Sequence, residues 1–216
     1  MVAPVVTLDG LYVKIAWTPP TANNDPITSY QVLIEDATNT YIEDTAVCDG
    51  ADATNFANLF CRVPMTKLWT TPFSLPQGRT ITAKVAAING RGSSAISVAN
   101  TVGVDVETVP HQMSAPTQDP STSHSAVAIS WSAVSAPQNG DSAILSYIVY
   151  WDAGAGTGSF TELVGETSQS TATTYTITTG IVTGTSYQFK IKAVNKWGTG
   201  EFSATVLSVL AASVPG

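Results

Sequence analysis

The chain has 216 residues, of which 44% are hydrophobic and only 12% charged, and its formal net charge is −7. The negative charge argues against binding to nucleic acid or to an anionic membrane surface, because both need a basic face on the protein. No apolar run approaches the roughly 18 residues of a membrane-spanning helix, so we expect no membrane insertion in this segment.

Short segments in which polar and apolar residues alternate follow one another along the chain, separated by turn-forming residues. Since side chains alternate between the two faces of a strand, such segments predict strands with one buried and one exposed face. In the first half we expect strands near residues 11–18, 27–36, 39–46, 60–64, 79–89 and 93–103. In the second half we expect them near residues 125–132, 144–152, 159–165, 172–178, 185–195 and 201–210. Many short strands at this spacing are typical of a β-sandwich.

The sequence repeats itself, and the repeat predicts two tandem domains. Residues 13–17 and 127–131 both alternate and both end in Trp, so we predict that Trp17 and Trp131 are core residues. Residues 84–89 likewise match residues 190–195. Between the repeats, Pro110 and Pro116 restrict φ, which favours an extended, semi-rigid connector. We expect one module at residues 1–107, a connector at 108–115 and a second module at 116–216.

A late strand of the second repeat carries a distinctive pattern. It contains Gly184, Thr185, Tyr187, Phe189, Ile191, Ala193 and Asn195, followed by Gly198, Gly200 and Ser203. Together with Trp131 and Tyr147, this pattern makes the repeat resemble a fibronectin type III domain over its whole length. The resemblance implies an all-β fold of two tandem seven-stranded antiparallel β-sandwiches, immunoglobulin-like and with fibronectin type III topology. It also implies a tyrosine corner, in which the Tyr187 hydroxyl bonds to upstream backbone.

The first repeat departs from this pattern. Ile81 stands where Tyr187 stands in the second repeat, so we expect no corner hydrogen bond there, and an insertion precedes Gly78. Residues 61–65, Leu68, Pro72, Phe73, Leu75, Gly78 and residues 83–85 resemble a cysteine-containing variant in large repeat-bearing surface proteins of ciliates and similar protists. Both resemblances imply a spacer or adhesion module that lies outside the cell or at its surface.

Two cysteines, Cys48 and Cys61, flank one loop of the first repeat. Their even count, their position around a loop and the family resemblance together favour a disulfide, which suggests an oxidising compartment. Closing this loop would add roughly 3 kcal/mol of stability by the loop-entropy estimate. The alternative is a pair of buried free thiols, as in many intracellular proteins.

The residues that carry chemistry are sparse. His111 and His124 lie in or near the connector and far from the cysteines in the sequence, so neither a zinc site nor a Ser-His-Asp site is favoured. Asp105, Glu107 and Asp119 surround the connector, but calcium is the less favoured interpretation because their spacing matches no known Ca²⁺ loop. We expect no catalytic residues, no cofactor and no enzyme activity.

Three side chains are candidates for binding: Arg91, Trp197 and Trp69. Arg91 lies where some family members carry an integrin-binding Arg-Gly-Asp, but Ser93 replaces the acidic residue, so the integrin interpretation fails. Trp197 is an aromatic residue at a loop tip, a good anchor for a partner, although it could instead pack over its own loop. Trp69 belongs to the insertion, whose apolar residues could form a surface or fill the edge of their own sandwich.

The function we expect is a non-catalytic extracellular structural or adhesion spacer that acts through protein–protein contacts with other modules or with a surface partner. The alternatives are an accessory module of a secreted polysaccharide-degrading enzyme and part of a receptor ectodomain. The pair Val109-Pro110 recurs as Val214-Pro215 after the second module. This recurrence predicts that the segment comes from a longer tandem-repeat protein.

Overall fold

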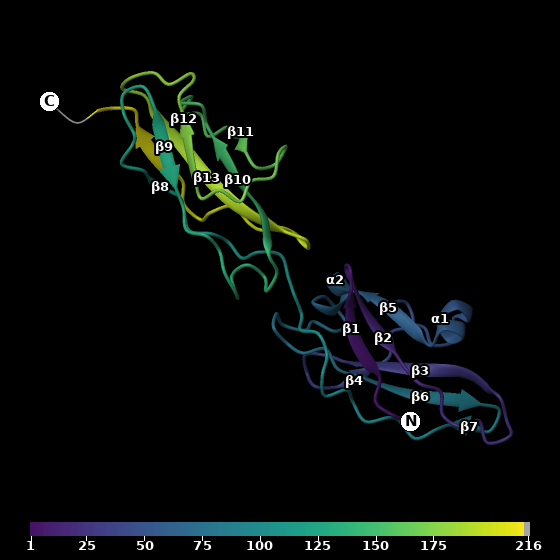
Figure 1. Cartoon of the computed structure of the whole chain (residues 1–216). Helices are drawn as coiled ribbons and strands as arrows, with labels where there is room; N and C mark the ends of the chain where they lie inside the picture. The colour runs from purple at the N-terminus through teal and green to yellow at the C-terminus, as the bar shows by residue number, and fades with distance from the viewer. Residues whose placement is uncertain (214–216) are drawn as a thin grey trace. The chain divides into compact units, whose positions relative to one another are not determined.

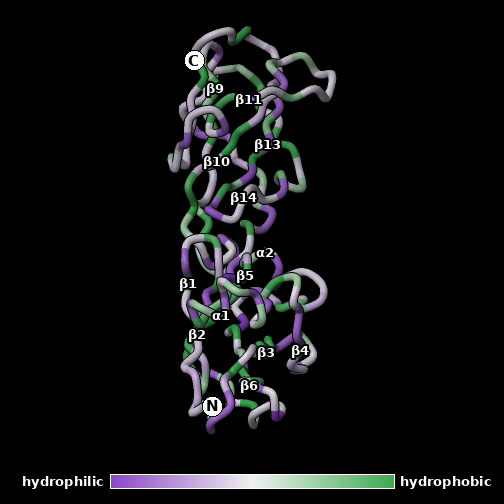
Figure 2. The backbone as a smooth tube through the Cα atoms, turned by 90° about the vertical axis from the view of Figure 1, so that its right-hand side faces the viewer, coloured by the Kyte–Doolittle hydropathy of each residue, from purple (hydrophilic) through white to green (hydrophobic). Residues whose placement is uncertain are grey.

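A computed structural model describes residues 1–213 of the chain. The chain divides into two compact units, Met1–Thr108 and Val109–Gly216, which we call unit 1 and unit 2 and describe separately. Hydrophobic residues, green in Figure 2, are spread through both units, as expected for many short strands that each contribute one face to a core. The second Val-Pro pair, at residues 214 and 215, lies outside the described residues.

Unit 1 is a sandwich of two antiparallel sheets (Figure 1). One sheet has the order β1 (Val5–Asp9), β2 (Tyr12–Ala16) and β5 (Phe60–Pro64). The other has the order β4 (Tyr41–Ile42), β3 (Ile27–Glu35), β6 (Ala83–Asn89) and β7 (Gly92–Ser93). Alternate residues of these strands, among them Ile15, Val32 and Val85, are buried between the sheets. The apolar residues whose alternation predicted the strands are therefore also the residues that form the core.

Two short helices in unit 1 were not predicted: α1 (Ala53–Asn58) and α2 (Met65–Leu68). The Asp52 side chain caps α1 by accepting hydrogen bonds from the N–H groups of Thr54 and Asn55, and α1 ends at Leu59 in the left-handed conformation. Both helices are too short to produce a helical period in the sequence. Around α2, the insertion buries the side chains of Met65, Leu68, Phe73 and Leu75, so it adds to the core of its own unit.

Unit 2 has the same strand order. One sheet contains β12 (Thr174–Ile177), β9 (Val127–Ser130) and β8 (Thr117–Gln118). The other contains β11 (Thr161–Val164), β10 (Ile144–Trp151), β13 (Ser186–Asn195) and β14 (Gly198–Thr199), and β15 (Leu207–Leu210) also pairs with β13. The chain is thus an all-β protein of two tandem β-sandwiches, as predicted. The last strand of unit 2 is interrupted, so its eight segments correspond to seven strand positions.

The last strand of unit 1 is shorter than the predicted 93–103. Side chains replace the expected backbone partners of β6: Asn100 Oδ1 accepts from the Ala83 N–H at 2.7 Å, and Ser97 Oγ accepts from the Val85 N–H at 3.0 Å. In unit 2, Ser203 Oγ accepts from the Ile191 N–H at 3.3 Å in the same way. Hydroxyl and amide groups can satisfy strand donors as well as carbonyls can, so the segment follows the sheet without forming a regular ladder.

The core residues predicted from the repeat are buried. Trp17 and Trp131 are 5% and 9% exposed. The Tyr187 hydroxyl accepts a hydrogen bond from the Val182 N–H at 2.8 Å and donates one to the Gly180 carbonyl at 3.3 Å, which is the tyrosine corner that the resemblance implied. Ile81, its counterpart in unit 1, is fully buried and has no hydroxyl to form such a corner.

The segment around the expected connector packs on unit 2. The His111 N–H donates to the Gln138 carbonyl at 2.8 Å, and the Gln112 side-chain amide donates to the Phe202 carbonyl at 2.8 Å. Met113 belongs to the hydrophobic core of unit 2. These contacts attach residues 111–113 to the second sandwich.

Candidate functional site

Cys48 and Cys61 form a disulfide in unit 1, with their Cα atoms 5.4 Å apart. Cys61 lies in β5 opposite Ile15, and Cys48 lies in the loop before α1. In the same loop, the Gly50 carbonyl accepts a hydrogen bond from the Tyr30 N–H at 3.1 Å. A Cβ atom at residue 50 would lie 2.1 Å from the Tyr30 carbonyl oxygen, so only glycine allows this close approach. The bridge therefore ties the loop to one sheet while Gly50 docks it on the other.

Arg91 lies in the turn between β6 and β7. Its Nε is 4.0 Å from Asp25 Oδ2, and its side chain remains 90% exposed. Together with residues 20–23 and 92–94, Arg91 lines a shallow hollow of about 260 Å³. Ser93 is also exposed there, so an exposed cation and hydroxyls are available at this end of unit 1.

Trp69 and Arg91 do not converge on one site. Trp69 ends α2, which begins where the Met65 N–H donates to the Leu11 carbonyl in the β1–β2 turn. Arg91 lies instead near Asp25, in the connection that follows β2. Because β2 runs from one of these connections to the other, the two side chains lie at opposite ends of unit 1.

Trp197 lies in the turn between β13 and β14 of unit 2. Its ring is half-buried, its backbone N–H donates to Asn195 Oδ1 at 2.8 Å, and Lys196 Nζ lies 4.7 Å from the ring centroid. Part of the ring thus packs locally and part remains accessible to a partner.

A set of residues that sequence reasoning missed lies on the outer face of the β10–β13 sheet: Tyr150, Phe160, Lys190, Lys192 and Phe202. We call it the lysine–aromatic face. Lys190 Nζ lies 4.5 Å from the Phe160 ring centroid and 4.2 Å from that of Phe202, and Lys192 Nζ lies 4.6 Å from that of Phe202. The Tyr150 and Phe202 rings contact edge to face, with centroids 5.2 Å apart. The alternation of Lys190 and Lys192 was visible in the sequence, but the rings come from three separate segments.

Two carboxylates near this face are held by their own surroundings. The Glu162 carboxylate accepts hydrogen bonds from the Thr167 hydroxyl and from the N–H groups of Thr167 and Glu166. These bonds, the Thr167 hydroxyl first, lower the pKa of Glu162. The Tyr150 hydroxyl donates to the Glu166 carboxylate, and this bond raises the pKa of Tyr150. The hydrogen bonds of both glutamates therefore hold the loop that follows β11.

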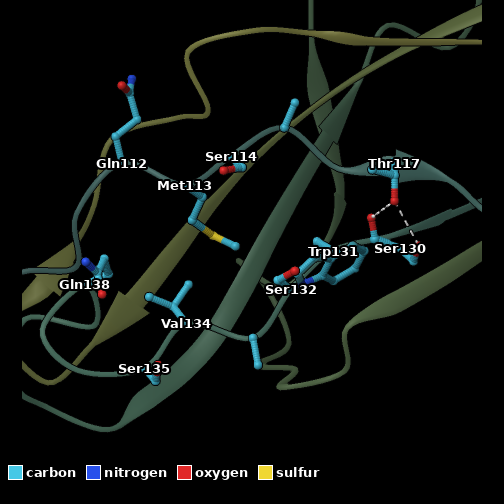
Figure 3. Close-up of a pocket in the computed structure, with 12 residues that line it drawn as sticks. Gln112, Met113, Ser114, Thr117, Ser130, Trp131, Ser132, Val134, Ser135 and Gln138 are labelled. Carbon is cyan, nitrogen blue, oxygen red and sulfur yellow. Dashed lines mark hydrogen bonds between the residues drawn. The ribbon is translucent and has the colours of Figure 1, made fainter.

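A pocket of about 490 Å³ in unit 2 lies between residues 112–117 and residues 130–138 (Figure 3). Thr117 and Ser130 are joined by a hydrogen bond on one side of it, and Met113 and Val134 lie on the other. Its lining contains serines, Gln112 and Gln138 but no charged side chain. Its serines have no base among the lining residues, so the pocket has no group to activate a nucleophile.

The acidic residues considered for calcium have local partners. Asp105 Oδ1 accepts from the Thr80 hydroxyl at 2.6 Å, and Asp119 Oδ1 accepts from the Ser121 hydroxyl at 2.7 Å, a bond that lowers the pKa of Asp119. Within residues 1–213, no group of three or more His, Cys, Asp or Glu side chains is placed to hold a metal ion. His124 Nδ1 lies 2.8 Å from Ser213 Oγ. No helix in this part of the chain is long and apolar enough to cross a membrane.

Comparisons with known proteins bear directly on unit 2. The family model described as "Fibronectin type III domain" matches residues 110–209. Such domains are usually non-catalytic and generally mediate protein contacts. The match lies within unit 2, so the resemblance of unit 1 to the cysteine-containing variant of protist surface proteins stays a prediction.

Solved structures of tandem domains are similar to the whole chain. The FN1–FN3 domains of chicken CNTN1 are 19% identical with a TM-score of 0.40, over 97% of this chain and 66% of that chain. Domains A168–A170 from titin are 21% identical with a TM-score of 0.48, over 98% of this chain and 62% of that chain. This chain therefore spans less than two thirds of either structure. No curated protein matches the sequence.

Proposed function

We propose that this chain is a non-catalytic structural or adhesion segment of an extracellular protein and that it acts through protein–protein contacts. The match of residues 110–209 to the fibronectin type III family model is the observation that carries the proposal. The proposal includes the division into modules at residues 1–107 and 116–216 with a connector at 108–115, and their origin in a longer tandem array. The partners would be other modules of that array or a protein on a neighbouring surface.

The use of the acidic residues supports a structural role. Asp36, Asp52, Asp119, Asp152 and Glu162 each accept hydrogen bonds from backbone N–H groups of their own loops. Asp152 is buried, and it also accepts a hydrogen bond from the Gln188 N–H on β13. Carboxylates placed in this way hold loops rather than converge on a substrate, as a spacer requires.

The disulfide supports the extracellular location. Disulfides persist in oxidising compartments and are rare in reducing ones. The Cys48–Cys61 bridge is buried, with exposures of 2% and 0%, so it is shielded from exchange with other thiols. Arg91, Trp69 and Trp197 are the loop residues that we propose for contacts with partners.

Surface labelling of intact source cells tests this proposal. We expect a membrane-impermeant biotin reagent to label the native protein, and mass spectrometry without reductant to find the peptide pair that contains Cys48 and Cys61. The parent reading frame should encode further sandwich modules. A protein that stays unlabelled until the cells are lysed, with both cysteines free, would refute the extracellular role.

A further inference from the structure

The basic residues of unit 2 are concentrated on one strand and its following turn. Residues 109–216 contain three lysines, no arginine and six acidic residues, so the unit has a net charge of −3. The three cations are Lys190, Lys192 and Lys196. Lys190 and Lys192 are two positions apart on β13, and their neighbours Phe189 and Ile191 are buried in the core. Both lysines therefore project from the outer face of the sheet.

Aromatic rings hold these two ammonium groups in place. Lys190 lies between the rings of Phe160 and Phe202, and Phe202 also contacts Lys192. Tyr150 supports the same arrangement through its edge-to-face contact with Phe202. Cation–π contacts restrict flexible lysine side chains and leave their N–H donors available to an anion.

Among the described residues, no carboxylate forms an ion pair with either lysine. Throughout residues 1–213, neither Lys190 nor Lys192 has a carboxylate oxygen within 4.0 Å. The nearby Glu162 and Glu166 are held by Thr167 and Tyr150, respectively. The lysine–aromatic face therefore presents two ammonium groups that have no ion-pair partner among residues 1–213, on a negatively charged unit.

We infer that the lysine–aromatic face binds an extended polypeptide segment with carboxylates at alternate residues. Residues two apart on a strand are separated by about 6.6–6.8 Å, so alternate glutamates or aspartates of an extended partner match the spacing of Lys190 and Lys192. The net charge of −7 disfavours a uniformly charged polyanion, because long-range repulsion grows with its charge. A short acidic segment places its charge only where the two lysines lie. This inference rests on the proposed protein-binding function and names the chemistry of one partner.

Unit 1 provides an internal control. Lys84 on β6 matches Lys190 in the repeat and lies 3.8 Å from the Tyr41 ring centroid. Its neighbour Ala86 stands where Lys192 stands in unit 2, and Ala86 is fully buried. Unit 1 thus presents one lysine at this place instead of a spaced pair.

Fluorescence anisotropy with two blocked, labelled peptides of equal charge tests the inference on the intact chain. In the first peptide, glutamate and threonine alternate over eight residues; in the second, four consecutive glutamates precede four threonines. We expect the alternating peptide to bind more tightly. Lys190→Gln and Lys192→Gln should each weaken its binding by about twofold to fivefold, as for exposed charge pairs, and Lys84→Gln should leave it unchanged. Lys192→Arg, which retains the charge, should retain most of the affinity.

Three results would overturn the inference: equal binding of the two peptides, an equal loss in Lys84→Gln, or no binding of either peptide at millimolar concentration. Tighter binding of heparin than of the alternating peptide would assign the face to polyanions instead. Melting curves of each variant check that the fold is intact. None of these results bears on surface labelling of source cells, so a failure here is distinguishable from a failure of the proposed function.

Discussion

The tyrosine corner allows one hydroxyl to be removed with little other change. Tyr187→Phe keeps the buried ring, which stacks on Trp151 with centroids 5.7 Å apart. It deletes the oxygen that bonds the Val182 N–H and the Gly180 carbonyl. Any loss of stability can therefore be attributed to these two hydrogen bonds.

The expected cost follows from the number of bonds and their burial. A hydrogen bond contributes about 0.5–1.5 kcal/mol net, so two bonds give about 1–3 kcal/mol. Tyr187 is only 1% exposed, so water cannot easily replace the hydroxyl. For a domain of this size, each 1 kcal/mol lowers the melting temperature by about 4–8 °C. The melting temperature of unit 2 should therefore fall by at least about 4 °C.

Hydrogen exchange mass spectrometry in increasing urea measures this effect, because peptides from each unit report on their own unfolding. Peptides that cover β12 and β13 should lose protection at lower urea in Tyr187→Phe, and peptides that cover β2 and β6 should not change. Tyr175→Phe is the matched control, since the half-buried Tyr175 makes no side-chain hydrogen bond in the part of the chain that the structure describes. If Tyr187→Phe costs no more than Tyr175→Phe, the corner does not stabilise this domain.

Three further predictions concern the bridge, the core and one loop. Replacing both Cys48 and Cys61 by serine should lower the free energy of unfolding of unit 1 by roughly 3 kcal/mol, and reductant should destabilise the parent but not the variant; equal thermal midpoints would contradict the role of the bridge. Trp131→Ala should cost unit 2 about 3–5 kcal/mol, enough to unfold it in urea well before unit 1, and a change of only a few degrees in its melting temperature would contradict the assigned core. The pKa of the Glu162 carboxyl is lower in the folded chain than in the unfolded chain. Its hydrogen bonds therefore stabilise the fold fully at a pH above the unfolded pKa of Glu162, and this stabilisation is lost as the pH falls through the folded pKa. The NMR-detected protection of the Thr167 amide, which is its intrinsic exchange rate divided by its observed rate, should therefore fall in acid, and in Glu162→Gln it should show no such step.

Much of the fold could be predicted because a strand leaves a local, periodic record in the sequence. Val13, Ile15 and Trp17 alternate with less buried residues, and all three are buried. The same record in the second repeat predicted the burial of Trp131. These predictions rest on a period of two, which depends on neighbouring positions alone. The corner at Tyr187 was implied instead by the resemblance to the fibronectin type III family.

The helices and the last strands were harder to predict. The helix α1 has six residues and α2 has four, so neither completes the two turns that a helical pattern needs. In the predicted strand at 93–103, polar and apolar residues alternate as in a strand. In the structure, however, the side chains of Ser97 and Asn100 accept hydrogen bonds from β6. Whether a serine bonds a backbone group with its hydroxyl or with its own carbonyl depends on the approach of the two segments, which the sequence does not encode locally.

The sequence by itself therefore determined the sandwich class, the two-fold repeat, the core tryptophans and the resemblance of the second module to the fibronectin type III family, because alternation and motif spacing are local properties. Tertiary structure alone decided which surface residues lie together. Tyr150, Phe160 and Phe202 lie on separate segments, and only the pairing of β10 with β13 and the return of the chain past β14 bring their rings to Lys190 and Lys192. Contacts of this kind depend on loop paths and sheet register, so these lysines and rings come together only after the chain has folded.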